Sequence, residues 1–216
     1  MHSRLRHQPA LLIFAKQPLA GDTKTRLQPD YSPQQAADIA AFMLRATVEL
    51  AVANWPGEVS LYGAPDANHP LFSDLADEFG VRLAQQQGHD LGERMRHAFA
   101  DVLTRRRAVA IFGCDVPHCS WAILDQANSW LAKGRNVLGP TEDGGYYFIG
   151  LTAPHAGLFG GVDWGTDRVL TQTLERARSL GVEFELLPRL CDVDTADDLR
   201  RVSQKYTPLR QFLKLI

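Results

Sequence analysis

A short apolar run in the middle of the chain constrains the fold most. Residues 108–113, Ala-Val-Ala-Ile-Phe-Gly, lie between three arginines and a turn that contains Asp115 and Pro117. A continuous apolar run of this length, bounded by turn residues, is typical of a strand buried on both faces of a parallel sheet. Such a strand delivers the residues that follow it to the carboxyl edge of the sheet, where open α/β folds bind ligands. We therefore expect Asp115 to lie at a ligand site.

Apolar patterns along the rest of the chain alternate between strand and helix periods. We predict strands at 10–15, 58–62, 81–85, 108–113, 136–139, 146–151 and 183–187, and helices at 33–55, 71–79, 91–103, 120–132, 166–180 and 195–203. This alternation predicts a mostly parallel sheet with helices on both faces, and an antiparallel insertion around Gly144 and Gly145. The 216 residues fit one α/β domain, residues 10–216, after a flexible N-terminus at residues 1–9.

Composition excludes several classes of partner. The formal net charge of −2 gives no electrostatic basis for binding nucleic acid or an anionic membrane. The first apolar segment ends at Lys16 and Pro18, which makes it too short for a signal peptide or a membrane span. The three cysteines make no disulfide framework. We expect a cytoplasmic protein without nucleic-acid or membrane partners, and the oligomeric state stays open.

The loop after the first predicted strand is rich in cations. Lys16, Lys24 and Arg26 fall within eleven residues, and Gly21 lies among them. A diphosphate needs cations and a backbone that can approach it closely, and this loop offers both. The spacing of its glycine and lysine excludes a P-loop. A solvated loop with ordinary surface cations is the alternative interpretation.

Two aspartates elsewhere in the chain could form a metal site. Asp115 follows the central strand, and Asp194 lies in an acidic run near the end of the chain. Carboxylate oxygens are the ligands that hard divalent cations prefer. Each aspartate also has a structural alternative, because Asp115 could cap the helix after Pro117 and Asp194 could cap the last helix.

A further acidic pair precedes two glycines in the predicted antiparallel insertion. Glu142 and Asp143 come directly before Gly144 and Gly145, which permit a positive φ and the close approach of a ligand. A positioned carboxylate could act as a general base on an acceptor hydroxyl. A polar hairpin turn is the alternative. Trp164 could line a substrate pocket, although packing is the more common role of a tryptophan before a helix.

Six motifs, taken together and in order, resemble a known family. They are LLIFAKQPLAGDTKTRL, DLGERM, FGCDVPHCS, LGPTEDGGYYFIGL, DWGTDRVLTQT and DVDTADDL, and they extend over residues 10–203. The set resembles a bacterial glycosyltransferase-A-like (GT-A-like) family of nucleotide-diphospho-sugar transferases. That family includes arsenosugar-biosynthesis-type glycosyltransferases associated with radical-SAM clusters. The resemblance implies a single-domain, Rossmann-like GT-A fold.

The resemblance also implies roles for particular positions. It implies that the first loop holds the nucleotide phosphates and that Asp115 and Asp194 hold Mg²⁺ or Mn²⁺. The acidic-glycine loop would serve the acceptor. The segment around Asp115 departs from the family pattern, because it contains no Asp-x-Asp pair. The positions that match the family are Gly21, Lys24 and Arg26 for the nucleotide, and Glu142, Asp143, Gly144 and Gly145 for the acceptor side. From the residues themselves, we add Lys16 to the nucleotide side and Trp164 to the acceptor side.

These observations favour a metal-dependent transferase that moves a glycosyl group from a nucleotide-diphospho-sugar donor to a small acceptor. Asp143, with Glu142 second, would orient or deprotonate the acceptor. One alternative is a nucleotidyltransferase that joins a nucleoside triphosphate to a phosphorylated acceptor and releases pyrophosphate through the same residues. The other is a non-catalytic nucleotide sensor, since fold alone does not establish catalysis.

Overall fold

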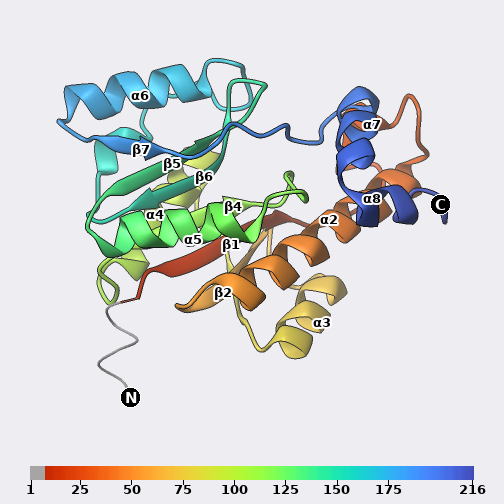
Figure 1. The fold of residues 1–216 in the computed structure, drawn as a ribbon, viewed down its shortest axis with the longest axis horizontal. Coiled ribbons are helices and arrows are strands. Elements are labelled where there is room, and N and C mark those ends of the chain that lie inside the picture. The colour runs from red at the N-terminus through yellow and green to blue at the C-terminus, as the bar shows by residue number, and fades with distance from the viewer. Residues whose placement is uncertain (1–7) are drawn as a thin grey trace.

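One seven-stranded sheet organises residues 8–216, the part of the chain that the computed structural model describes. Most of the predicted flexible segment, residues 1–7, lies outside the described residues. The strand order is β3-β2-β1-β4-β6-β5-β7 (Figure 1). The strands are β1 Ala10–Lys16, β2 Val59–Ala64, β3 Arg82–Gln85, β4 Val109–Gly113, β5 Asn136–Pro140, β6 Tyr146–Leu151 and β7 Phe184–Leu186.

The sheet is parallel except for one strand. β6 runs antiparallel to both of its neighbours, β4 and β5, and every other pairing is parallel. The predictions of a mostly parallel sheet and of an antiparallel insertion are therefore confirmed. The central strands β1 and β4 are buried on both faces, which explains why their sequences are continuous apolar runs.

Helices cover both faces of this sheet, as predicted. Alternate residues of β1 contact opposite layers: Leu11 belongs to the core cluster with α2, α3 and α5, while Leu12 belongs to the cluster with α4 and α6. In residues 8–216, none of the helices has the length and apolar character needed to cross a bilayer. The helices are α2 Pro33–Asn54, α3 Pro70–Phe79, α4 Leu91–Val102, α5 Trp121–Ala132, α6 Val169–Ser179, α7 Ala196–Lys205 and α8 Thr207–Phe212, with 3₁₀ turns η1 Thr25–Leu27 and η2 Ala156–Leu158.

Two helices differ from the predicted pattern. α6 begins at Val169 rather than at Thr166, because the Thr166 hydroxyl donates to the carbonyl of Asp163 and accepts from the Arg168 amide, which forms a turn before the helix. Helix α8 was not predicted. Its buried Leu209 packs with residues of α2 and α7 in a third core cluster.

This third cluster brings the end of the chain back to the sheet. After β7, residues 187–195 run along the carboxyl edge of the strands before α7 packs near the start of α2 (Figure 1). The Leu190 amide donates to the carbonyl of Pro140, and the Val193 amide donates to the carbonyl of Asp115. These contacts place the late acidic run beside the ends of β4 and β5.

Candidate functional site

A cleft of about 440 Å³ opens at the carboxyl edge of the sheet. Its walls come from the end of β1, the loop after it, the end of β4, the start of β6 and the late acidic segment. Among the predicted site residues, those that line it are Lys16, Lys24, Arg26, Asp115 and Asp194. Lys24 and Asp194, which lie 170 positions apart in the sequence, thus meet in one cleft. Gly21 lies in the same loop with a φ of +93°, and no described atom outside its neighbours lies within 4 Å of the position a Cβ would take.

Lys24 lies at the centre of the charged groups in this cleft. Its Nζ atom is 2.7 Å from Asp115 Oδ1, 2.8 Å from Asp194 Oδ1 and 2.6 Å from the carbonyl oxygen of Val193. Only 9% of the Lys24 side chain is exposed. Burial alone would lower the pKa of Lys24, but the two carboxylates beside it raise that pKa above its ordinary value. The ammonium is therefore charged and fully engaged.

The structural alternatives for both aspartates are excluded by the helix caps. Helix α7 is capped by Thr195, whose side chain forms a capping box with Asp198. Helix α5 begins after Ser120, beyond Asp115 in the chain. Neither Asp115 nor Asp194 caps a helix, and the partners of their carboxylates are the cations of the first loop.

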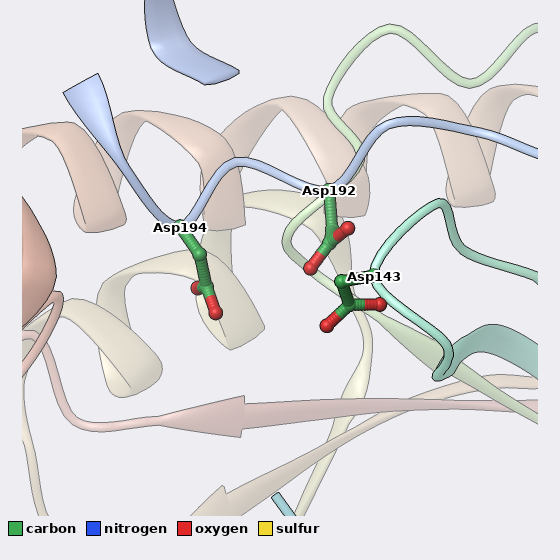
Figure 2. Close-up of side chains that lie close together, drawn as sticks. All are labelled: Asp143, Asp192 and Asp194. Carbon is green, nitrogen blue, oxygen red and sulfur yellow. The ribbon is translucent and has the colours of Figure 1, made fainter. Parts of the chain in front are cut away.

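A third aspartate, Asp192, joins the site and was missed in the sequence. Ligand atoms of Asp143, Asp192 and Asp194 all lie within 4.8 Å of one another. Figure 2 shows the three carboxylates directed into the same space between the late acidic segment and the β5–β6 loop. The signal was present in the sequence: alternate residues of an extended segment share one side, and the intervening Val193 is buried in the core. Asp192 and Asp194 form the Asp-x-Asp pair that the segment around Asp115 lacks.

The crowding of carboxylates changes the titration of Asp192. Burial, followed by repulsion from Asp143, Asp194 and Asp115, raises the pKa of Asp192 to about 7. A carboxylate with this environment is stabilised in its ionised form by a nearby cation. Near neutral pH, a proton and a cation therefore compete for this carboxylate.

The two acidic residues of the β5–β6 loop have different surroundings. Asp143 Oδ1 accepts hydrogen bonds from the Thr141 hydroxyl and the Gly145 amide, which fixes the carboxylate beside Asp192. Glu142 instead binds Arg201 of α7 at 2.8 Å. Of the two predicted catalytic acids, Asp143 is the one whose carboxylate joins the acidic group.

Other predicted acceptor-side residues have structural roles. Gly144 has a φ of +92°, and a Cβ there would lie 2.1 Å from the carbonyl oxygen of Asp167. The group that approaches this glycine closely is therefore the backbone of Asp167. Trp164 packs against Gly92 of α4 and makes an edge contact with Tyr146, whose ring lines the cleft. The packing role expected for a tryptophan before a helix is therefore observed.

The donor set fits a hard divalent cation. Carboxylate oxygens are the preferred ligands of Mg²⁺, and Mn²⁺ accepts the same oxygen ligands. The ammonium of Lys24 is a stand-in cation, because it already bridges Asp115 and Asp194. Asp194 contacts Lys24 and also belongs to the acidic group with Asp143 and Asp192.

The chain is similar in sequence to one protein family. The model of DUF2064, described as uncharacterized proteins conserved in bacteria, matches residues 47–166. A search of curated proteins finds no match.

Solved structures share the fold. A protein from Desulfovibrio desulfuricans G20, provisionally described as a nucleotide-diphospho-sugar transferase, is 30% identical with a TM-score of 0.83, over 91% of this chain and 87% of that one. Rv0371c from Mycobacterium tuberculosis H37Rv, in complex with manganese, is 19% identical with a TM-score of 0.53, over 91% and 98%. The 4-diphosphocytidyl-2C-methyl-D-erythritol synthase from Anaerococcus prevotii is 7% identical with a TM-score of 0.61, over 94% and 98%. The GT-A-like fold expected from the motifs is confirmed.

Proposed function

The chain belongs to the DUF2064 family, and we propose that it is a metal-dependent transferase that moves a glycosyl group from a nucleotide-diphospho-sugar to a small acceptor. One observation carries the proposal: three cations and two metal-type carboxylates line the same cleft. The provisional description of the relative from Desulfovibrio desulfuricans supports the same class of donor. Rv0371c, which has this fold and is solved with manganese, makes Mn²⁺ the first ion to test.

The cations of the first loop would bind the diphosphate. Lys16 and Arg26 are exposed in the cleft, where their charges can reach a bound anion. Negative charge builds up on the diphosphate as the glycosidic bond breaks, so fixed cations at this position stabilise the transition state. A divalent ion bound by Asp115 and Asp194, with Asp192 beside them, would act as a Lewis acid on the same oxygens.

The carboxylate of Asp143 would serve the acceptor. Two hydrogen bonds hold its Oδ1 atom, and the carboxylate faces the acidic group. This fixed orientation suits a group that accepts a proton from an acceptor hydroxyl. Gly144 and Gly145 would shape this side of the site, and Trp164 would act on it through Tyr146. Glu142, which is paired with Arg201, would help to hold the loop.

Nucleotidyl transfer is the second candidate, and the charge of the cleft favours it as well. Lys16 and Arg26 are exposed in the cleft, and a triphosphate would give them more phosphate oxygens to bind. The reaction would release pyrophosphate instead of a nucleoside diphosphate. The identity of the released product therefore separates the two candidates.

Product analysis with a matched pair of variants tests the proposal. Wild-type protein is incubated with nucleotide sugars or nucleoside triphosphates, Mn²⁺ and a panel of small acceptors, and the released phosphates are identified by chromatography. We expect a nucleoside diphosphate, and we expect Asp115→Asn to lower kcat by about 10²- to 10³-fold, as for loss of other electrostatic groups. Asp197→Asn is the control, because this exposed carboxylate pairs with Arg200 on α7. Turnover in Asp115→Asn at the wild-type rate contradicts the proposal, and metal-independent binding without turnover indicates a sensor.

A further inference from the structure

The proposed reaction does not by itself explain the position of the Lys24 ammonium. A lysine ammonium has three donors. In Lys24 all three meet acceptors: one on Asp115, one on Asp194 and one on the backbone of Val193. A lysine so engaged has no donor left for a phosphate.

The position of this ammonium conflicts with metal binding. The oxygens that it contacts, Asp115 Oδ1 and Asp194 Oδ1, belong to the two carboxylates proposed as metal ligands. Mg²⁺ binds its oxygen ligands at about 2.0–2.1 Å. An ion bound to both oxygens would lie against Nζ, and two cations in contact repel each other strongly in a partly buried site. Lys24 in this position therefore competes with a metal for these two oxygens.

We propose that Lys24 is an internal counter-ion that holds Asp115 and Asp194 until a diphosphate draws its ammonium away, so that metal and donor bind with strong mutual dependence. The inference rests on the proposed function, because it assumes that the same two carboxylates bind the metal. A metal alone must displace the ammonium, and a diphosphate alone must compete with two carboxylates for it. When both ligands bind, each relieves the other of that competition, and the coupling is reciprocal.

The loop geometry allows this exchange. The Lys24 side chain is unbranched and reaches its partners through a flexible stem, so its head can turn toward the cleft that it already lines. Among the described residues, Lys24 is the one non-glycine with a positive φ, at +47°. The Lys24 side chain reaches Asp115 and Asp194, while the neighbouring Thr25 and Arg26 are exposed. The other two cations of the cleft cannot take over the bridging role in this structure, since Lys16 is exposed and Arg26 reaches Asp194 alone, at 3.5 Å.

Binding of Mn²⁺ in the absence of nucleotide tests the inference directly. The dissociation constant is measured at pH 7.5 by electron paramagnetic resonance of free Mn²⁺, for wild type, Lys24→Met and Lys24→Gln. Both variants keep a side chain of similar length but remove its charge, and the second keeps a polar head in case the first does not fold. Lys16→Met is the matched control, since it removes a charge from the same cleft without touching Asp115 or Asp194. Asp115→Asn, in the wild-type and Lys24→Met backgrounds, shows whether the bound ion is the one proposed.

The expected result is that Lys24→Met and Lys24→Gln bind Mn²⁺ about tenfold more tightly than wild type, within the usual range of coupling between sites. Lys16→Met gives a clearly smaller change, and Asp115→Asn abolishes the gain. If the Lys24 variants bind Mn²⁺ as wild type does, or more weakly, while Asp115→Asn still removes binding, the metal site stands and the counter-ion role is overturned. If Asp115→Asn leaves the affinity for Mn²⁺ unchanged in both backgrounds, Asp115 is not a ligand of the bound ion. The proposed metal site and the inference are then both wrong.

Discussion

At the scale of single residues, the site is a balance between carboxylates and one buried ammonium. Lys24 compensates Asp115 and Asp194, whereas no lysine or arginine of the described residues forms an ion pair with Asp143 or Asp192. Burial, followed by repulsion from the neighbouring carboxylates, raises the pKa of Asp192. A divalent ion would remove the repulsion between the carboxylates. The crowding that destabilises the metal-free site would therefore favour binding of the ion.

The first prediction concerns pH. Since the pKa of Asp192 is raised to about 7, protons compete with metal for this carboxylate below that pH, and we expect the affinity for Mn²⁺ to rise from pH 6 to pH 8 and then level off. The Asp192→Asn variant should show a flatter dependence, and Asp197→Asn should keep the wild-type slope. Calorimetric titration of Mn²⁺ across this range checks it, and equal slopes in all three proteins would contradict it.

The same shift affects stability in the absence of metal. The folded chain holds the Asp192 proton more tightly than the unfolded chain, where an Asp pKa is about 3.9. The free energy of unfolding that this residue contributes is therefore fully present below about pH 4 and is lost as the pH rises toward about 7. Added Mn²⁺ should oppose that loss.

The second prediction compares two glycines with nearly the same φ. Gly21→Ala introduces only the strain of a left-handed alanine, at a cost of about 1–2 kcal/mol. Gly144→Ala adds a Cβ that would lie 2.1 Å from the carbonyl oxygen of Asp167, so the backbone must shift and the cost should be larger by about 1–3 kcal/mol. Denaturant unfolding of both variants measures the difference. Equal losses would mean that the β5–β6 loop does not need close contact with the start of α6.

At the scale of helices and strands, local signals in the sequence predicted most elements. The start of α2 is one case, where Ser32 caps the helix, Pro33 follows at the first turn and Gln35 completes a capping box. Near the end of the chain the local signal was ambiguous, because Asp194 and Thr195 are both good caps. Only the tertiary packing of α7 selects Thr195 and leaves Asp194 for the site. Helix α8 is short and depends on its contact with α2, which no local pattern predicts.

The third prediction tests that choice of cap. Thr195→Ala removes the side-chain oxygen that accepts from the Asp198 amide, and it should lower the free energy of unfolding by about 0.5–2 kcal/mol. Thr195→Ser keeps the hydroxyl and should remain close to wild type. Thermal and denaturant unfolding check both. An unchanged stability in Thr195→Ala would show that α7 does not depend on this cap.

At the scale of the whole molecule, the carboxyl edge of one sheet collects residues from distant parts of the chain. The sequence predicted a mostly parallel sheet with an antiparallel insertion. It also predicted that Lys24, Asp115 and Asp194 come together, because strand ends of a parallel sheet share an edge. It did not predict the strand order or the path of residues 187–195 across that edge. The contacts of Lys24 with Asp115 and Asp194, and the proximity of Asp192 to Asp143, follow from these long-range placements.

The most direct test of the account is calorimetric titration of nucleoside diphosphates, triphosphates and nucleotide sugars into wild type and Asp115→Asn, with and without Mn²⁺. We predict that wild type binds a nucleoside diphosphate or its sugar tightly only with Mn²⁺, and that Asp115→Asn loses this dependence together with most of the affinity. Preference for a triphosphate would favour nucleotidyl transfer. Binding that is equal with and without the metal, or no nucleotide binding at all, would contradict the central claim that this cleft is a metal-dependent nucleotide site.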